Sequence, residues 1–211
     1  MLASDIIAKF EEYVDDATEL SSTQELDLLQ KVYNKVWMHR PWEFAKKPAT
    51  GSFALTAPHM ALPADFEYFV ENNQATDNSV SVENNAAPKV IFITSNYTPV
   101  QIINWSDRRQ YLNQTGFAYL DLPNNGITFT WTPTAIDTYE FDYKKIADTL
   151  LTTSTPAFPA RYHDMLYHGM AVDDDIILRF PKAQSYAAEN QSRFDSYLRD
   201  MGYWNAMLQL N

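Results

Sequence analysis

The spacing of apolar residues changes twice along this chain, and that change constrains the fold more than any other feature. Through residues 6–20, and again through residues 26–37, apolar side chains recur every three or four positions, which places them on one face of a helix. Residues 22–25 (Ser-Thr-Gln-Glu) have the spacing of a capping box that begins at Ser22. We therefore expect two amphipathic helices, the second of which begins at this box and ends before Pro41.

The middle of the chain, residues 48–147, has the pattern of strands. It is rich in Thr, Asn, Pro, aromatic and β-branched residues, and its apolar runs are too short for helices. Residues 123–126 (Pro-Asn-Asn-Gly) predict a tight turn, and thus a hairpin between residues 117–120 and 127–131. Residues 137–143 alternate polar and apolar side chains, as a half-buried strand does. We expect roughly five or six strands in a small antiparallel sandwich or barrel.

Helical spacing returns after Pro159. One helix is expected from Pro159 to Pro181, because proline lacks the backbone N–H that would continue the hydrogen-bond ladder. A last helix should run from Pro181 to about Gly202, since glycine is typical of the position after a helix end. Residues 203–211 are then left as an apolar tail without a core of its own.

The two ends of the chain are expected to fold together. Neither terminal pair of helices is predicted to be stable alone, because each has an apolar face that needs a partner. The simplest architecture is α+β: a helical bundle formed by residues 1–47 and 148–211, with a small antiparallel β-sandwich or barrel module, residues 48–147, inserted between them.

Composition excludes several classes of protein. The 211-residue chain contains no cysteine, which excludes disulfides, thiolate metal sites and a cysteine nucleophile. Its formal net charge of −11 predicts that nucleic acid is repelled rather than bound specifically. No basic leader and no apolar run of membrane-spanning length is apparent, so we expect a protein made in a cytoplasm, without membrane contact.

No arrangement of reactive side chains predicts catalysis, a metal site or a cofactor. His163 and His168 are five residues apart, so on a helix they lie on different faces and do not form a ligand pair. Residues 173–175 are three consecutive aspartates, which point in different directions on a helix and predict an acidic surface patch. Glu11 and Asp15 do share a face, but nothing apolar beside them would raise one pKa selectively. Motifs for phosphate loops, nucleophile elbows and zincins are absent, so we expect a protein that is not an enzyme.

Three short segments resemble, in their order along the chain, the head-to-tail adaptor or head-completion proteins of tailed bacteriophages. That family includes the tail tubular A protein of short-tailed phages. The segments are Arg-Pro-Trp-Glu at residues 40–43, Leu-Pro-Ala-Asp-Phe at residues 62–66, and Pro-Ala-Phe-Pro-Ala-Arg-Tyr-His at residues 156–163. As an order of elements, the resemblance extends over nearly the whole chain.

The resemblance implies a structural virion protein at the interface between head and tail, assembled in the host cytoplasm. Such adaptors form homo-oligomeric rings, commonly twelvefold, beneath the portal protein, with the tail nozzle or another tail component attached below. DNA passes through the channel of the ring during genome ejection without specific binding. The host, the tail type and the identity of the tail-side partner do not follow from the resemblance.

Three sets of residues are candidate functional positions on this view. Acidic residues would repel DNA in the lumen or form subunit contacts: Glu11, Asp15, Asp16, Asp173, Asp174 and Asp175. The family's C-terminal segment often reaches the portal, which implies a docking tail here: Tyr203, Trp204, Met207, Leu208 and Leu210. The alternative is that this tail folds over its own bundle. A third set is expected to fix the corner between the bundle and the β module: Trp37, Pro41, Trp42 and Phe44.

Two other functions are possible from the sequence. A carbohydrate-binding β-sandwich would stack sugars on exposed aromatic rings, for which the candidates are Trp105, Tyr111, Phe117, Tyr119 and Trp131. An enzyme of unrecognised type would need convergent carboxylates such as Asp137, Glu140 and Asp142, although alternating acids on a strand more often form its wet face.

Overall fold

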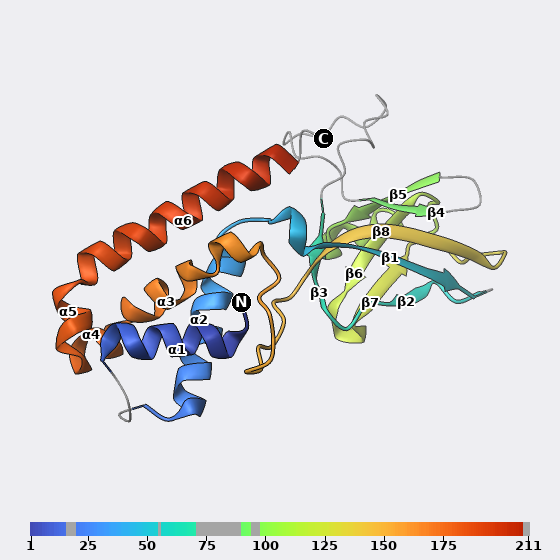
Figure 1. The fold of residues 1–211 in the computed structure, drawn as a ribbon. Coiled ribbons are helices and arrows are strands. Elements are labelled where there is room, and N and C mark those ends of the chain that lie inside the picture. The colour runs from blue at the N-terminus through green and yellow to red at the C-terminus, as the bar shows by residue number, and fades with distance from the viewer. Residues whose placement is uncertain (16–19, 55, 71–89, 94–97, 209–211) are drawn as a thin grey trace. The chain divides into compact units, whose positions relative to one another are not determined.

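A computed structural model describes residues 1–15, 20–54, 56–70, 90–93 and 98–208 (Figure 1). The chain divides into two compact units, one formed by Met1–Ala45 with Ala147–Asn211, the other by Lys46–Ile146. The first unit is helical and is built from both ends of the chain, while the second consists of strands. The predicted α+β class is confirmed, and the predicted domain division, residues 1–47 with 148–211 and residues 48–147, stays a prediction.

The helical unit is centred on α3 (Asp164–Ala171), which contacts α1 (Ala3–Val14), α2 (Ser22–Met38) and α6 (Ala187–Leu208). Two short helices, α4 (Asp174–Arg179) and α5 (Pro181–Ser185), connect α3 to α6. The core includes Ile6, Phe10, Leu29, Val36, Leu166 and Met170, all fully buried. A side chain at Gly169 of α3 would collide with α2 and α6, so glycine permits this close approach of three helices.

The first helix is shorter than its apolar pattern predicts. It ends at Val14 rather than near Leu20, because Asp15 adopts the left-handed conformation (φ 57°) and its backbone N–H closes the helix onto the carbonyl of Glu11. A left-handed residue cannot continue a right-handed helix, so the apolar spacing beyond it does not describe the same element. Asp16 lies outside the described residues.

The capping box of α2 is shifted by one residue from its predicted position. Ser21, not Ser22, is the N-cap, and its Oγ accepts from the backbone N–H of Gln24 at 3.3 Å. In return, Gln24 Oε1 accepts from the backbone N–H of Ser21 at 2.9 Å. The helix ends at Met38, before Pro41, as predicted.

The helices after Pro159 are divided differently from the prediction. Instead of one helix up to Pro181, a 3-10 turn (Ala160–Tyr162) is followed by α3 and α4, because Asp173 has extended backbone angles and caps α4 with its carboxylate. Beyond Pro181 the chain forms α5 and then α6, and α6 continues through Gly202 to Leu208. The predicted stop near Gly202 is therefore wrong.

The β unit is one sheet of eight strands in the described part of the chain, more than predicted. Its path runs β1 (Lys46–Phe53), β8 (Asp137–Lys145), β4 (Val90–Ile93), β5 (Thr98–Ile103), β6 (Phe117–Asp121), β7 (Gly126–Phe129) and β2 (His59–Ala61). β3 (Phe66–Phe69) pairs with β8 beyond this path. The two ends of the path, β1 and β2, contact each other, so the sheet is nearly closed.

The sheet is antiparallel except between β5 and β6, which are parallel. The predicted hairpin is confirmed as β6 and β7, with Leu120 opposite Ile127, and Asn125 supplies the positive φ (47°) of the connection. The predicted alternation in β8 is also present, since Tyr139, Phe141 and Tyr143 are buried.

Candidate functional site

An aromatic cluster fixes the segment that follows α2. Trp42 is fully buried, its Nε1–H donates to the carbonyl of Val36 at 2.8 Å, and its ring stacks on Phe44 with centroids 5.6 Å apart. Trp37 meets the same Phe44 ring edge-on at 5.5 Å. Pro41 is exposed and follows the helix end after His39 and Arg40. These residues pack within the helical unit, and their predicted role at a corner with the β module stays a prediction.

The end of α6 packs against this cluster on one side. Asn205, which is buried, accepts the backbone N–H of Glu43 with its Oδ1 at 2.6 Å. Trp204 is half-buried and stacks on Phe44 with centroids 6.2 Å apart. Trp204 thus folds over its own bundle, as the alternative to a docking tail requires.

The opposite side of the same turns is exposed. Tyr203 is 66% exposed, Met207 57% and Leu208 42%, while Leu210 lies outside the described residues. Beside them is a hollow of about 420 Å³, lined by Arg161, Tyr162, Asp200, Tyr203, Trp204 and Met207. The Arg161 guanidinium lies 4.7 Å from the ring centroid of Tyr162 and 5.8 Å from that of Trp204. Residues 203–208 of the predicted tail therefore form the last part of a helix, with Tyr203, Met207 and Leu208 exposed.

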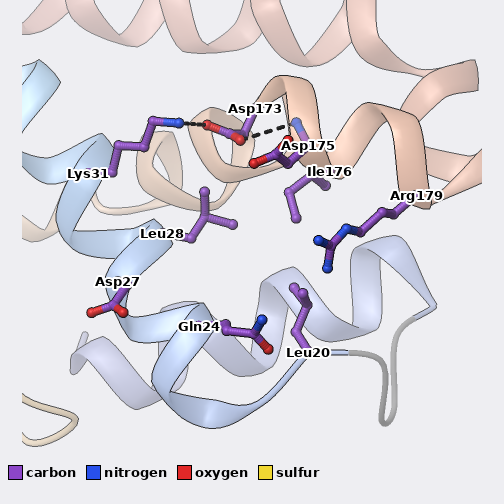
Figure 2. A pocket seen from close by; sticks show the side chains of 9 residues that line it. All are labelled: Leu20, Gln24, Asp27, Leu28, Lys31, Asp173, Asp175, Ile176 and Arg179. Atoms are coloured by element: carbon purple, nitrogen blue, oxygen red, sulfur yellow. Dashed lines mark hydrogen bonds and ion pairs between the residues drawn. The ribbon is translucent and has the colours of Figure 1, made fainter.

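A second hollow, of about 260 Å³, is lined by residues of α2 and α4, by Asp173, which is the N-cap of α4, and by Leu20 (Figure 2). Lys31 of α2 forms an ion pair with Asp173 at 2.6 Å, and this hydrogen bond raises the pKa of the lysine. Asp173 also accepts the backbone N–H of Asp175 at 3.3 Å, and its side chain is only 11% exposed. Arg179 points toward the same hollow from the other end of α4. Asp173 therefore has local structural contacts that the sequence pattern did not indicate.

The other predicted acidic residues lie at the start of α4 and the end of α1. Asp174 and Asp175 are exposed. Glu11 is half-buried, and Asp15 is exposed and 3.4 Å from Lys182. Nothing in these positions tests the predicted lumen or subunit contact.

His163 and His168 are both buried in the helical unit. His168 Nδ1 donates to Asn190 Oδ1 at 2.8 Å, and His163 Nε2 donates to the carbonyl of Phe158, also at 2.8 Å. Burial lowers the pKa of each imidazole, more than the hydrogen bonds raise it. Within the described ranges, no group of three or more His, Cys, Asp or Glu side chains could hold a metal ion.

The aromatic residues of the β unit contact one another. Trp105 is 43% exposed, but the Arg108 guanidinium lies 3.8 Å from its ring centroid, and Tyr119 meets its ring edge-on at 5.2 Å. Tyr111 packs on Phe117, and Trp131 on Phe129. A sugar would have to displace Arg108 from the face of Trp105 that the arginine covers. Of the carboxylates of the enzyme alternative, Glu140 and Asp142 alternate along β8 with the buried aromatics, whereas Asp137 has the parity of the buried face and so points to the side opposite Glu140.

Sequence reasoning missed Arg161 and Asn205. Asn205 falls on the helical face of Phe194, Leu198 and Met201, so a polar residue in a buried stripe was the signal that could have found it. Arg161 had no such signal, since a single arginine before a tyrosine is ordinary.

Comparison with known proteins identifies the family of this chain. A family model described as SU10 adaptor protein matches residues 1–209, which include the described parts of both units. Among curated proteins, none matches the chain. In the described part of the chain, no helix is both long and apolar enough to cross a membrane.

Proposed function

The chain belongs to the SU10 adaptor protein family of phage adaptors, and from this we propose that it works as one subunit of a ring between portal and tail. As a phage adaptor it is a structural component of the virion, which interacts with portal and tail components, rather than an enzyme. The observation that carries the proposal is the family match over both units. We infer assembly in the host cytoplasm, a ring that is commonly twelvefold in such adaptors, and a tail nozzle or another tail protein on the far side.

The exposed face at the end of α6 is the surface we assign to the portal. Three large side chains, Tyr203, Met207 and Leu208, are exposed together on consecutive turns of one helix. A helix that presents apolar side chains at this spacing fits a groove on a partner. The guanidinium of Arg161 borders the same hollow and can donate hydrogen bonds to a polar group of that partner.

The acidic surface supports the proposed DNA channel. With a net charge of −11, a ring of these subunits carries a strongly negative charge, which repels DNA and allows it to pass without adhering. Asp15, Asp174 and Asp175 are the exposed members of the proposed lumen or subunit-contact set, with Glu11 half-buried beside them. Asp173 supports this surface indirectly, since it caps α4.

Native mass spectrometry and negative-stain microscopy test the ring and its attachment to the portal protein of the same phage. We expect closed rings on the portal, even where the chain alone is monomeric, because a partner can drive assembly. The double variant Tyr203→Glu/Met207→Glu should abolish attachment, whereas Leu178→Glu, at a leucine of α4 that is 82% exposed, should not. A chain that remains monomeric with portal, or a double variant that attaches normally, contradicts the proposal. Truncation at Gly202 is a poor test, since it also removes Asn205 from the helical unit.

A further inference from the structure

The last two turns of α6, residues 201–208, have two faces with different surroundings. Met201, Gly202 and Asn205 are buried, whereas Tyr203 and Met207 are exposed. Both sets belong to the same helical turns and share their backbone hydrogen bonds. Contacts that stabilise these turns through the buried residues therefore also hold the exposed residues in place.

The buried face is fixed to the segment that leads into β1. We call residues 40–45 the root segment, because Ala45 directly precedes Lys46, the first residue of that strand. The backbone N–H of Glu43 donates to Asn205, and the ring of Phe44 stacks on Trp204. These are two of three contacts that join the two segments. The third is between Arg40 and Gly202.

A contact with Arg40 accounts for the presence of Gly202 within α6. The Arg40 guanidinium lies directly against Gly202, where a Cβ atom would collide with it. The same guanidinium is 5.3 Å from the ring centroid of Trp42. The glycine therefore allows an arginine of the root segment to lie close both to α6 and to a buried tryptophan, at the cost of a weaker helix.

We propose that the end of α6 and the root segment form one coupling element, so that a partner bound to the exposed face of α6 also fixes the segment from which the β unit begins. Helix ends open locally at low free-energy cost, and opening of these turns would break all three contacts. A partner that binds only the helical form shifts this opening equilibrium and stabilises the root segment with it. The identity of the partner rests on the proposed portal-docking function, but the internal coupling does not.

The coupling can be measured on the full chain without any partner. Ala206 is exposed, so Ala206→Gly weakens the end of α6 without removing one of the three contacts. Amide hydrogen exchange followed by NMR should then be about fivefold faster at Glu43 and Ala45, as well as at residues 203–208. The matched control is Ala188→Gly, the same change at an exposed alanine in the first turn of the same helix, which should leave Glu43 and Ala45 unchanged. Faster exchange at residues 203–208 with unchanged exchange at Glu43 overturns the proposal.

The reciprocal experiment uses the portal protein. Coupling between two sites is mutual, so loosening the root segment should weaken binding at the exposed face. Asn205 is buried, with 4% exposure, and cannot form a substantial contact with the portal, yet Asn205→Ala should weaken portal binding by roughly tenfold. Arg199→Ala, at an exposed position on the same helix, is the control and should bind as the unchanged chain does.

The two proposals fail in different ways. If Asn205→Ala binds portal normally while Tyr203→Glu/Met207→Glu does not, the coupling is wrong and the docking face stands. If neither the unchanged chain nor any variant binds portal, the docking proposal fails. The exchange rates of the Ala206→Gly chain alone then decide whether the coupling exists.

Discussion

The buried histidine of α3 predicts that the helical unit loses stability in mild acid. His168 is 1% exposed, and burial lowers its pKa below the ordinary value, while the hydrogen bond to Asn190 acts in the opposite direction. Arg193 also lowers this pKa, and the nearby Asp164 and Glu189 raise it. In the folded chain the imidazole is therefore neutral at pH values where the unfolded chain already binds a proton.

The sign and size of the effect follow from this difference. Because the folded pKa is the lower one, the full stability is present above the unfolded value of about 6.5 and is lost as the pH falls toward the folded value. When a histidine stays neutral in the folded state, only the unfolded chain binds the proton, so the free energy of unfolding falls by up to about 2 kcal/mol between pH 7.5 and pH 5. His163, whose pKa burial also lowers, adds a similar amount. The sum is a large fraction of the roughly 5–15 kcal/mol of a typical fold.

This loss of stability is measured by urea unfolding at several pH values, monitored by the far-UV circular dichroism signal of the helices. The variant His168→Gln keeps an amide that can donate to Asn190 but cannot ionise in this range. We expect it to lose less stability than the unchanged chain over the same pH interval, by up to about 2 kcal/mol, whatever its stability at pH 7.5. His39→Gln, the same substitution at an exposed histidine, is the matched control. Equal pH dependence in the His168→Gln and unchanged chains would refute the reasoning.

Two further predictions concern the helix start and the aromatic cluster. Ser21→Ala should destabilise the helical unit by about 1 kcal/mol in urea unfolding, since it removes the N-cap, whereas Ser22→Ala should change stability by less than about 0.5 kcal/mol; equal effects would contradict the observed cap. Trp42→Phe keeps a ring to stack on Phe44 but leaves the carbonyl of Val36 without its indole donor, so we expect a loss of about 1–3 kcal/mol in the same assay. An unchanged midpoint for Trp42→Phe would show that this hydrogen bond contributes little.

The sequence pattern predicted the class of each region because burial imposes a period on the residues. Tyr139, Phe141 and Tyr143 had to alternate with polar residues, since successive side chains of a strand point to opposite faces. The same logic found α1 and α2. It could not find where they begin and end, because Ser21 and Ser22 are equally good caps and only the backbone angles distinguish them.

Other features were beyond the reach of local patterns. The parallel pairing of β5 with β6 joins strands separated by the 3-10 helix Trp105–Arg109, and nothing in either strand specifies its neighbour. Gly202 suggested a helix end because that is where glycine most often occurs. Here its missing side chain makes room for Arg40, a residue about 160 positions earlier, and such long-range contacts leave no trace in local spacing.

For the proposed ring, the distribution of charge favours apolar contacts as the means by which subunits would associate. In the helical unit, Lys9, Lys31, Lys182 and Arg193 each form an ion pair within the chain, with Asp164, Asp173, Asp15 and Glu189. These cations are thereby engaged inside the subunit, and a net charge of −11 leaves neighbouring copies to repel one another. Surface ion pairs of this kind contribute at most about 1 kcal/mol each, too little to overcome that repulsion across the proposed ring. The exposed turns of α6, with Tyr203 and Met207 beside a cation, Arg161, offer what attachment to a partner needs: apolar area and a positive charge on an otherwise acidic molecule.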